Sequence, residues 1–315
     1  MEIPITQSKE WANLQSELGE KYFFEVGNNY QFLAILKNTP LGKYLYLPYG
    51  PFIEPGKNPQ KIIIARVMRK IRKIANDNKV FFIRIEPQIS DFTKNLPYKM
   101  KKSTDLNPKE TWILDLAGND DELKSKLPSR LCRYHKNAEK NGLTIEISHN
   151  PDDIDYLIDL QKALASKKGI NTFSKEYLRT ELSQPFASLY LVKYQPPEQN
   201  ISEVVAAGLV FDYFKTRYNL QGAQSEQGRK LHATGILTIQ LIKDAKAKNL
   251  KYFDFWGIAP DNASDNHPWK GFTNFKKTFA GREVKYNGTT DIILKPLKYN
   301  VYRVIRNINR LLRRV

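Results

Sequence analysis

The chain has little of what several common protein classes need. It holds one cysteine, Cys132, among 315 residues, which excludes a disulfide framework and a metal site built on cysteines. Its four histidines show no His-Glu-x-x-His or other metal-binding spacing. A Gly-x-Ser-x-Gly elbow, a Walker loop and a Gly-x-Gly-x-x-Gly turn after a strand are also absent. We therefore expect no metal, no nucleotide cofactor and no serine nucleophile.

Long apolar runs are missing as well. No stretch approaches the roughly 18 apolar residues of a membrane span, and no basic segment followed by an apolar run opens the chain. A hydrophobic content of 41%, with 16 Phe, 17 Tyr and 4 Trp, is enough for a large core and excludes a disordered chain. The length favours two domains of about 150 residues each. The sequence thus predicts a cytoplasmic globular protein, which we expect to be a monomer.

Acidic residues are few relative to basic ones. The chain has 50 Lys and Arg against 33 Asp and Glu, for a net charge of +17, which favours a polyanionic partner. A helix broken near Pro128 is expected over 120–141. Four of its cations fall within about a third of the helix circumference, and they are Arg130, Arg133, Lys136 and Lys140. This stripe is either a solvated basic face or a phosphate-binding surface.

Hydrophobic periodicity predicts the same order of elements in both halves of the chain. In each half, short strands precede an amphipathic helix that leads into a buried strand. The segments are 32–36, 43–48, a helix over 59–77 and 80–85 in the first half, then 189–194, 204–214, 218–221, a helix over 235–248 and 252–258. Hairpins mixed with helices predict an α/β (α+β) fold with mixed sheets and two similar domains meeting near residue 148.

This order resembles the GCN5-related N-acetyltransferase (GNAT) fold. Such enzymes hold the acetyl-CoA pyrophosphate on a Gly-rich turn that opens a helix. The equivalent turn here, 225–230, lacks the polar anchor and the final small residue, and Glu226 would repel phosphates. Use of acetyl-CoA is therefore disfavoured.

Short motifs spread over nearly the whole chain give a more specific resemblance. They are Glu10-Trp11-Ala12, Tyr49-Gly50-Pro51, Arg84-Ile85-Glu86-Pro87, segments 112–116 and 167–170, Tyr218 with Gly222-Ala223, segments 253–258 and 275–281, Tyr286-Asn287-Gly288 and Asp291. Each is weak alone, but their order and spacing resemble the FemABX family of aminoacyl-tRNA-dependent transferases that build peptidoglycan interpeptide bridges.

The resemblance implies two GNAT-like domains, residues 1–148 plus 298–315 and residues 149–297, with the C-terminal helix returning to the first domain. It implies the compact form, without the helical arm that some members insert. The implied reaction is non-ribosomal peptide-bond formation, in which an amino acid passes from aminoacyl-tRNA to the stem-peptide amine of a peptidoglycan precursor. The stripe on 130–140 would then bind tRNA.

The family's functional Phe-Lys pair falls on Phe275 and Lys276. The resemblance makes Lys276 the cation that faces the oxyanion or a phosphate, and Phe275 a surface for the terminal adenine; an exposed lysine and a core phenylalanine are the alternatives. Glu86 is a candidate base or amine-binding carboxylate. Arg84, on the same strand, either contributes to the site or neutralises Glu86. Asp254 is a turn acceptor or a site residue, and the structural role is favoured.

Two cations by which compact members grip a UDP-linked muropeptide are not at their usual places. Lys215 or Arg217 could replace the second, and Tyr218 of the motif is kept. We therefore expect lipid II rather than UDP-MurNAc-pentapeptide as the acceptor. The alternative functions are a GNAT-like N-acyltransferase that uses acyl-CoA and a non-enzymatic RNA-binding protein.

The last 21 residues, 295–315, carry seven Lys and Arg and no acidic residue. Apolar residues recur there at steps of three and four, so we expect an amphipathic helix. Its apolar stripe either packs on the first domain or, together with its charge, binds the anionic inner face of the plasma membrane.

Overall fold

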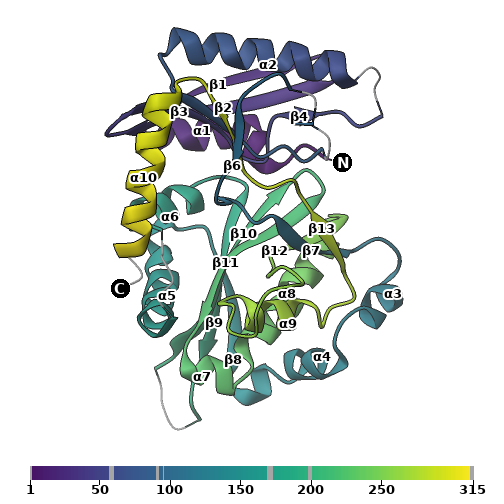
Figure 1. Cartoon of the computed structure of the whole chain (residues 1–315). Helices are drawn as coiled ribbons and strands as arrows, with labels where there is room; N and C mark the ends of the chain where they lie inside the picture. Colours follow the sequence, from purple (N-terminus) through teal and green to yellow (C-terminus); the bar gives the residue numbers. More distant parts are fainter. Residues whose placement is uncertain are drawn as a thin grey trace. The chain divides into compact units, whose positions relative to one another are not determined.

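The computed structural model describes residues 2–56, 60–89, 92–94, 96–168, 173–197 and 201–312, with the side chains of 164–168 and 310–312 outside this description. The chain divides into two compact units (Figure 1). Unit 1 is Met1–Lys109 with Lys285–Val315, and unit 2 is Glu110–Val284. Each unit is built on a seven-stranded mixed sheet.

The sheet of unit 1 begins as an antiparallel meander of β1 (Lys21–Gly27), β2 (Tyr30–Thr39) and β3 (Gly42–Leu47). Helix α2 (Gln60–Asp77) follows, and β5 (Phe82–Ile85) then pairs in parallel with β3. The strand order is β1-β2-β3-β5-β14-β6, with β4 on β2. The remaining elements are η1 (Ile5–Gln7), α1 (Lys9–Glu17), β4 (Phe52–Ile53), β6 (Met100–Lys102), β14 (Thr290–Ile293) and α10 (Pro296–Leu312).

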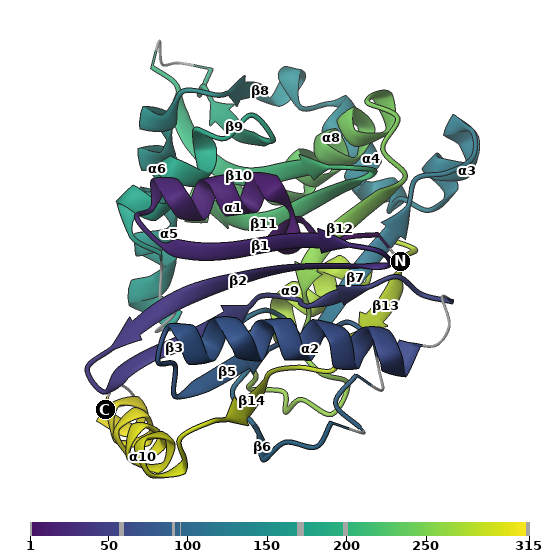
Figure 2. The same cartoon turned by 90° about the horizontal axis from the view of Figure 1, so that it is seen from above.

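Helix α2 lies lengthwise along this sheet (Figure 1 and Figure 2). Ile64, Val67 and Ile71 recur at three- and four-residue steps, so they share one face of the helix and are buried in the core against the strands. Helix α10 packs on the same unit by its aromatic side, where Tyr299 and Tyr302 contact Phe82. The expected return of the C-terminal helix to the first unit is therefore observed.

Unit 2 repeats the arrangement. Its strands run in the order β13-β7-β12-β11-β10-β9-β8, and β12 pairs in parallel with β11 after the intervening helix α8. The strands are β7 (Glu110–Asp115), β8 (Leu143–Ser148), β9 (Ala187–Tyr194), β10 (Glu203–Tyr213), β11 (Thr216–Gln224), β12 (Tyr252–Gly257) and β13 (Arg282–Lys285). The helices are α3 (Asp120–Ser125), α4 (Ser129–Lys136), η2 (Glu139–Asn141), η3 (Pro151–Asp153), α5 (Ile154–Lys168), α6 (Lys175–Leu182), α7 (Glu226–Lys230), α8 (Ala233–Ala247) and α9 (Lys270–Lys276).

Helix α8 is the central helix of unit 2, and Ile236, Ile239 and Ile242 on it are buried in the core. Gly235 lets α4 approach it closely, because a Cβ there would lie 2.6 Å from Leu131 Cδ2. This contact fixes α4, which carries most of the basic stripe, to the body of the unit.

The observed boundaries differ from the expected 148/149 and 297/298. Strand β7 pairs with β12, which places the chain from Glu110 onward in the second sheet. Strand β14 pairs with β5 and β6, which places it in the first. Both differences arise from pairing between strands distant in sequence. The expected helix over 120–141 is broken near Pro128 and ends a second time at Lys136, so Lys140 lies on a separate turn.

Some expected features fall outside the described residues. They are Pro59 at the start of the first helix, residues 169–170 of one motif, 198–200 of a hairpin loop and 313–315 of the basic C-terminus. Within the described part of the chain, no helix has both the length and the hydropathy to cross a bilayer.

Candidate active site

The sheet of unit 2 opens at the junction of β11 and β12. Parallel pairing joins Thr216–Tyr218 to Tyr252–Asp254 and then stops, although β11 continues to Gln224. On the other side of β12 the register with β7 shifts between Asp254 and Gly257. Trp256, within this bulge, has a φ of 65°, an unusual conformation for a bulky residue. Bulges and strained residues of this kind concentrate at functional sites.

Asp254 stabilises one side of the bulge. Its Oδ1 accepts a hydrogen bond of 2.7 Å from the backbone N–H of Trp256, and the residue is 2% exposed. Burial raises the pKa of Asp254 to about 7, while the Trp256 amide and the charge of Lys276 act in the opposite direction. The contact with Trp256 is the structural role favoured from the sequence.

Lys276 stabilises the other side of the bulge in β12. It is the last residue of α9, and its Nζ donates a hydrogen bond of 2.6 Å to the carbonyl oxygen of Gly257. Burial lowers the pKa of Lys276 to about 8, and the nearby Asp254 partly opposes this. Thr273 fixes α9 against the same segment, because its Oγ1 accepts from Ala259 N at 2.7 Å.

Asp254 and Lys276, whose pKa values both lie near neutrality, are thus on either side of one strained bulge. A lysine with such a pKa can donate hydrogen bonds as an ammonium and can also release a proton close to physiological pH. Among the residues that the structure describes, Gly257 uses one of its three N–H bonds, which leaves two for another acceptor. Perturbed pairs of this kind mark candidate functional sites.

The two aromatic candidates are Tyr218, which contacts the bulge, and Phe275, which precedes Lys276 on α9. Tyr218 lies in edge-to-face contact with Trp256, with ring centroids 6.2 Å apart. Phe275 is half-buried and contacts Phe279 edge to face at 5.6 Å, at the margin of the core. Its environment corresponds to the core phenylalanine that was the alternative to a stacking surface.

The structure corrects the expectation that Arg217 could serve as a substitute phosphate-binding cation. Arg217 is fully buried and its guanidinium donates twice to Asp212, at 2.6 and 2.7 Å. The rest of the guanidinium donates to the Tyr190 hydroxyl and the Leu241 carbonyl. Four of its five N–H donors are therefore used inside the protein, and its burial keeps the guanidinium away from a ligand at the surface. Lys215 is exposed in the β10–β11 hairpin and remains available.

Glu86 lies in unit 1, just after β5, and is 3% exposed. Its strongest donors are the Thr289 hydroxyl at 2.7 Å, the Asn107 amide at 2.8 Å and the Tyr46 hydroxyl at 2.9 Å. Backbone N–H groups of Tyr49, Leu106 and Asn107 lie at 3.3 to 3.4 Å. Through these contacts Glu86 ties several segments of unit 1 together.

Arg84 also departs from the expectation that it neutralises Glu86. It forms a bidentate ion pair with Asp291 on β14, at 2.7 and 2.8 Å. Tyr299 of α10 donates to the same carboxylate at 2.9 Å, and Arg84 donates to Ser103 at 3.0 Å. Arg84 is 2% exposed, so its role is structural: it connects β5, β14 and the C-terminal helix.

The basic stripe is exposed throughout: Arg130, Arg133, Lys136 and Lys140 are all at the surface. Arg130 donates to the Tyr134 hydroxyl at 2.7 Å, and Tyr134 stacks on His232 at 4.3 Å. The two arginines are therefore arranged around an aromatic pair that the sequence did not indicate. Trp256 is the other residue that was missed, because neither its conformation nor its contact with Tyr218 can be inferred from local pattern.

Of the predicted site residues, the structure brings Lys276, Asp254, Phe275 and Tyr218 to one region of unit 2, whereas Glu86 and Arg84 belong to unit 1. In topology, both units have an antiparallel meander, a helix and a returning parallel strand, which is a GNAT-like fold repeated twice. A tandem GNAT protein from the clavulanic acid biosynthesis pathway shares it, with a TM-score of 0.51 at 12% identity, covering 84% of this chain and 78% of that one.

Residues 188–307 match the FemAB family model. The structure of FemX is similar over 95% of this chain and 94% of that one, with a TM-score of 0.79 at 19% identity. The structure of L-PGS from Bacillus licheniformis is similar over 98% of this chain and 99% of that one, with a TM-score of 0.57 at 14% identity. No curated protein sequence matches the chain. Residues 188–307 therefore match the FemAB family, in agreement with the resemblance predicted from sequence, and the predicted fold class is confirmed.

Proposed function

We propose that this protein transfers an amino acid from aminoacyl-tRNA to the stem-peptide amine of a peptidoglycan precursor. The observation that carries the proposal is the Lys276–Asp254 pair at the β12 bulge, because both residues lie within the segment that matches the FemAB family model. The proposed site is therefore built from the part of the chain with the clearest family relationship.

In the proposed reaction the neutral acceptor amine attacks the ester carbonyl of the aminoacyl-tRNA. A C–N bond forms, a tetrahedral oxyanion develops, and the C–O bond to the tRNA 3′ oxygen then breaks. The proton lost by the amine balances the one taken up by the departing hydroxyl. The Lys276 ammonium supplies a hydrogen-bond donor to the oxyanion, and Asp254 acts through the bulge by fixing the peptide beside it. No covalent enzyme intermediate is needed.

We favour lipid II over UDP-MurNAc-pentapeptide as the acceptor. Arg217 is buried in an ion pair with Asp212, so a cation expected to hold the UDP phosphates is engaged elsewhere. A lipid-linked acceptor requires the enzyme to work at a membrane surface, and helix α10 has suitable features.

Helix α10 carries an exposed aliphatic stripe opposite its tyrosine face. Val301, Val304, Ile305 and Ile308 are 44 to 58% exposed, and at about 100° per residue they lie on one side of the helix, whereas Tyr299 and Tyr302 pack on unit 1. No acidic residue follows Asp291. We propose peripheral contact of this stripe with anionic lipid at the inner face of the membrane, where each nearby cation contributes about 1 kcal/mol.

Vesicle sedimentation tests the membrane contact. Ile305→Asn with Ile308→Asn should abolish pelleting with anionic vesicles, while Val26→Asn, at a 64% exposed position of β1, should leave it intact. Neutral vesicles should pellet neither protein. Equal pelleting of both variants, or none by the unaltered protein, would contradict the contact and favour the UDP-linked acceptor.

Product analysis tests the reaction itself. The protein is incubated with pools of charged tRNA and either lipid II or UDP-MurNAc-pentapeptide, and the acceptor is weighed by mass spectrometry. A mass gain of one or more amino acids that depends on charged tRNA is expected, and more strongly with lipid II. A gain that requires acyl-CoA instead would indicate an N-acyltransferase, and tRNA binding without any product would indicate an RNA-binding protein.

A further inference from the structure

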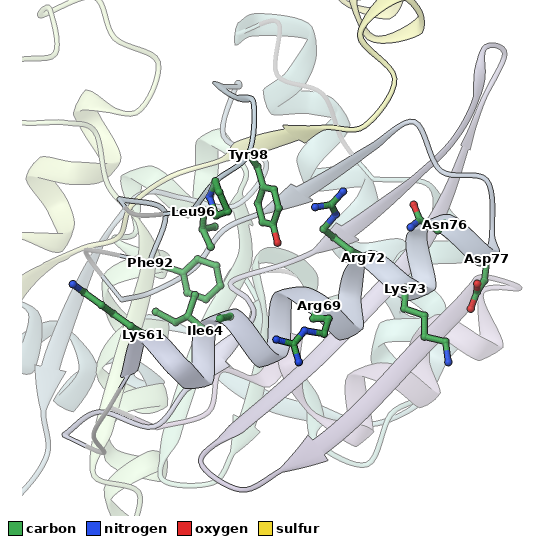
Figure 3. A pocket seen from close by; sticks show the side chains of 12 residues that line it. Lys61, Ile64, Arg69, Arg72, Lys73, Asn76, Asp77, Phe92, Leu96 and Tyr98 are labelled. Carbon is green, nitrogen blue, oxygen red and sulfur yellow. The ribbon is translucent and has the colours of Figure 1, made fainter.

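A cavity of about 610 Å³ lies in unit 1 between α2 and the segment around Phe92–Tyr98 (Figure 3). Its apolar part is formed by Ile64, Phe92 and Leu96, and Phe92 is 1% exposed. Its volume is within the range of about 300 to 1,000 Å³ that is usual for ligand sites. We call this cavity the α2 groove; the proposed transfer reaction does not use it.

Four cations of α2 line the groove: Lys61, Arg69, Arg72 and Lys73. At about 100° per residue they fall within roughly a third of the helix circumference. At about 1.5 Å rise per residue, the first and last are separated by about 18 Å along the helix axis. The charges therefore form a row along the groove rather than a cluster that converges on one point.

None of these four cations makes an ion pair with a residue that the structure describes. The adjacent Lys70, which lies outside the groove, is by contrast paired with Glu25. Arg69 stands three and four residues from Arg72 and Lys73, so like charges repel along the helix. Asp77, at the end of α2, is the one carboxylate among the residues that line the groove. Four cations against one carboxylate leave the lining with a net positive charge, which is suited to an external polyanion.

Arg72 and Tyr98 give the groove a second element of recognition. The Arg72 guanidinium lies 4.6 Å from the centre of the Tyr98 ring, and Figure 3 shows both side chains on the same side of α2. The ring is only partly buried. Aromatic and arginine planes beside a row of cations are the features by which proteins bind unpaired nucleotides, through base stacking and phosphate contacts.

We propose that the α2 groove binds the phosphodiester backbone of an unpaired RNA segment, with the cation row along the phosphates and Tyr98 beside a base. A compact diphosphate would fit less well, because its charge is concentrated at one place. The inference deepens the proposed function, on which it rests, by assigning unit 1 a share in binding the donor tRNA.

Binding of labelled, unacylated tRNA to the full chain tests the groove. In the variant, Lys61→Gln and Lys73→Gln remove two groove cations. In the matched control, Lys43→Gln and Lys79→Gln remove two exposed lysines of the same unit that do not line it. Each lost phosphate contact to a single strand lowers the slope of log affinity against log salt concentration by about 0.7. At 0.1 M salt this corresponds to a loss of about fivefold in affinity. The groove variant should therefore bind about 25-fold more weakly, and the control should keep the slope of the unaltered protein.

Equal loss in the groove variant and the control would overturn the inference in favour of net charge alone, and unchanged binding in both would overturn it outright. Lost pelleting with anionic vesicles, with tRNA binding retained, would make the groove a lipid-headgroup site instead. Circular dichroism and thermal unfolding check the fold. Transfer assays separate the two proposals: the groove variant should show a raised KM for aminoacyl-tRNA and an unchanged KM for the acceptor. Absence of transfer in the unaltered protein, with the 25-fold loss still present, would refute the reaction and leave the groove standing.

Discussion

Replacing Lys276 by methionine removes the ammonium group while keeping a side chain of similar length. If Lys276 donates to the oxyanion, the rate of aminoacyl transfer should fall by about 10²- to 10³-fold, as it does when one such donor is lost. The site offers no second ammonium near the Gly257 carbonyl among the described contacts. We therefore expect no partial compensation from a neighbouring lysine.

The same substitution should leave the protein folded, because two effects on stability oppose each other. Burial lowers the pKa of Lys276 from 10.5 to about 8, so the folded state disfavours the charged form by about 3 kcal/mol, and methionine relieves this. The Gly257 carbonyl loses its donor, at a cost of about 1 to 3 kcal/mol. The two nearly cancel, and the free energy of unfolding should change by less than about 2 kcal/mol.

The pH dependence of the rate provides an independent check. Lys276 loses its proton as the pH rises through about 8, so its contribution as a cation should be present below that pH and decline above it. In Lys276→Arg the guanidinium keeps its proton over this range. The decline in rate above pH 8 should therefore be absent in the arginine variant, even if its maximal rate is lower.

Single-turnover transfer from aminoacyl-tRNA measures these effects, and Lys277→Met is the matched control. Lys277 is adjacent in sequence but its Nζ pairs with Asp261 at 3.2 Å. The reasoning is refuted if Lys276→Met transfers as fast as the unaltered protein, or if Lys277→Met loses as much activity.

Three further predictions concern stability. Burial raises the pKa of Glu181 from 4.5 to about 8, so between these pH values the folded state holds a proton that the unfolded state has lost. The free energy of unfolding should therefore fall by up to about 4 kcal/mol as the pH rises from 5 to 8. In urea titrations, Glu181→Gln should lose this pH dependence. Arg84→Ala leaves Asp291, 1% exposed, without its cation and should cost about 3 to 5 kcal/mol in urea unfolding; a loss below 1 kcal/mol would contradict the buried pair. Gly281→Ala should lower the melting temperature, because its Cβ would lie 2.6 Å from Trp112 Nε1 and 2.7 Å from the Ile113 carbonyl oxygen; an unchanged melting temperature would show that these groups can shift.

Much of the fold was predictable because its central elements carry strong local patterns. The helix expected over 59–77 is observed at Gln60–Asp77, and the helix expected over 235–248 at Ala233–Ala247. Each precedes a buried apolar strand, so the repeated order of elements follows from hydrophobic periodicity alone. These helices and strands form the centre of each unit, where burial and periodicity agree.

The parts that could not be predicted depend on partners far away in sequence. Strand β14 has four residues and joins the sheet of unit 1 by pairing with β5 and β6, and β7 joins the sheet of unit 2 by pairing with β12. Short strands show little hydrophobic periodicity. Which of the two sheets a short strand joins depends on which strand edge is available for pairing. This is why the expected boundary at 148 lies well beyond the observed one at Lys109.

The roles of single charged side chains also depend on partners that are distant in sequence. From the sequence, Arg217 was a possible substitute for a phosphate-binding cation, and Arg84 was either a site residue or a partner of Glu86. Both are paired with carboxylates in the interior, Asp291 and Asp212. Residue type and local order can identify a candidate, but whether it faces a ligand or an internal partner is decided by tertiary packing.

The β12 bulge brings together two separate motifs of the FemABX resemblance. The first motif, 253–258, contains Asp254, which binds the N–H of Trp256; the second, 275–281, contains Lys276, which binds the carbonyl of Gly257. The two side chains hold neighbouring peptide groups of one strained turn, from a strand and from the end of a helix. Because burial shifts both pKa values toward neutrality, any change that lets water into the bulge should alter the ionisation of Lys276 and the conformation of Trp256 together. The strain, the pKa values and the proposed oxyanion donor are therefore consequences of the same packing arrangement.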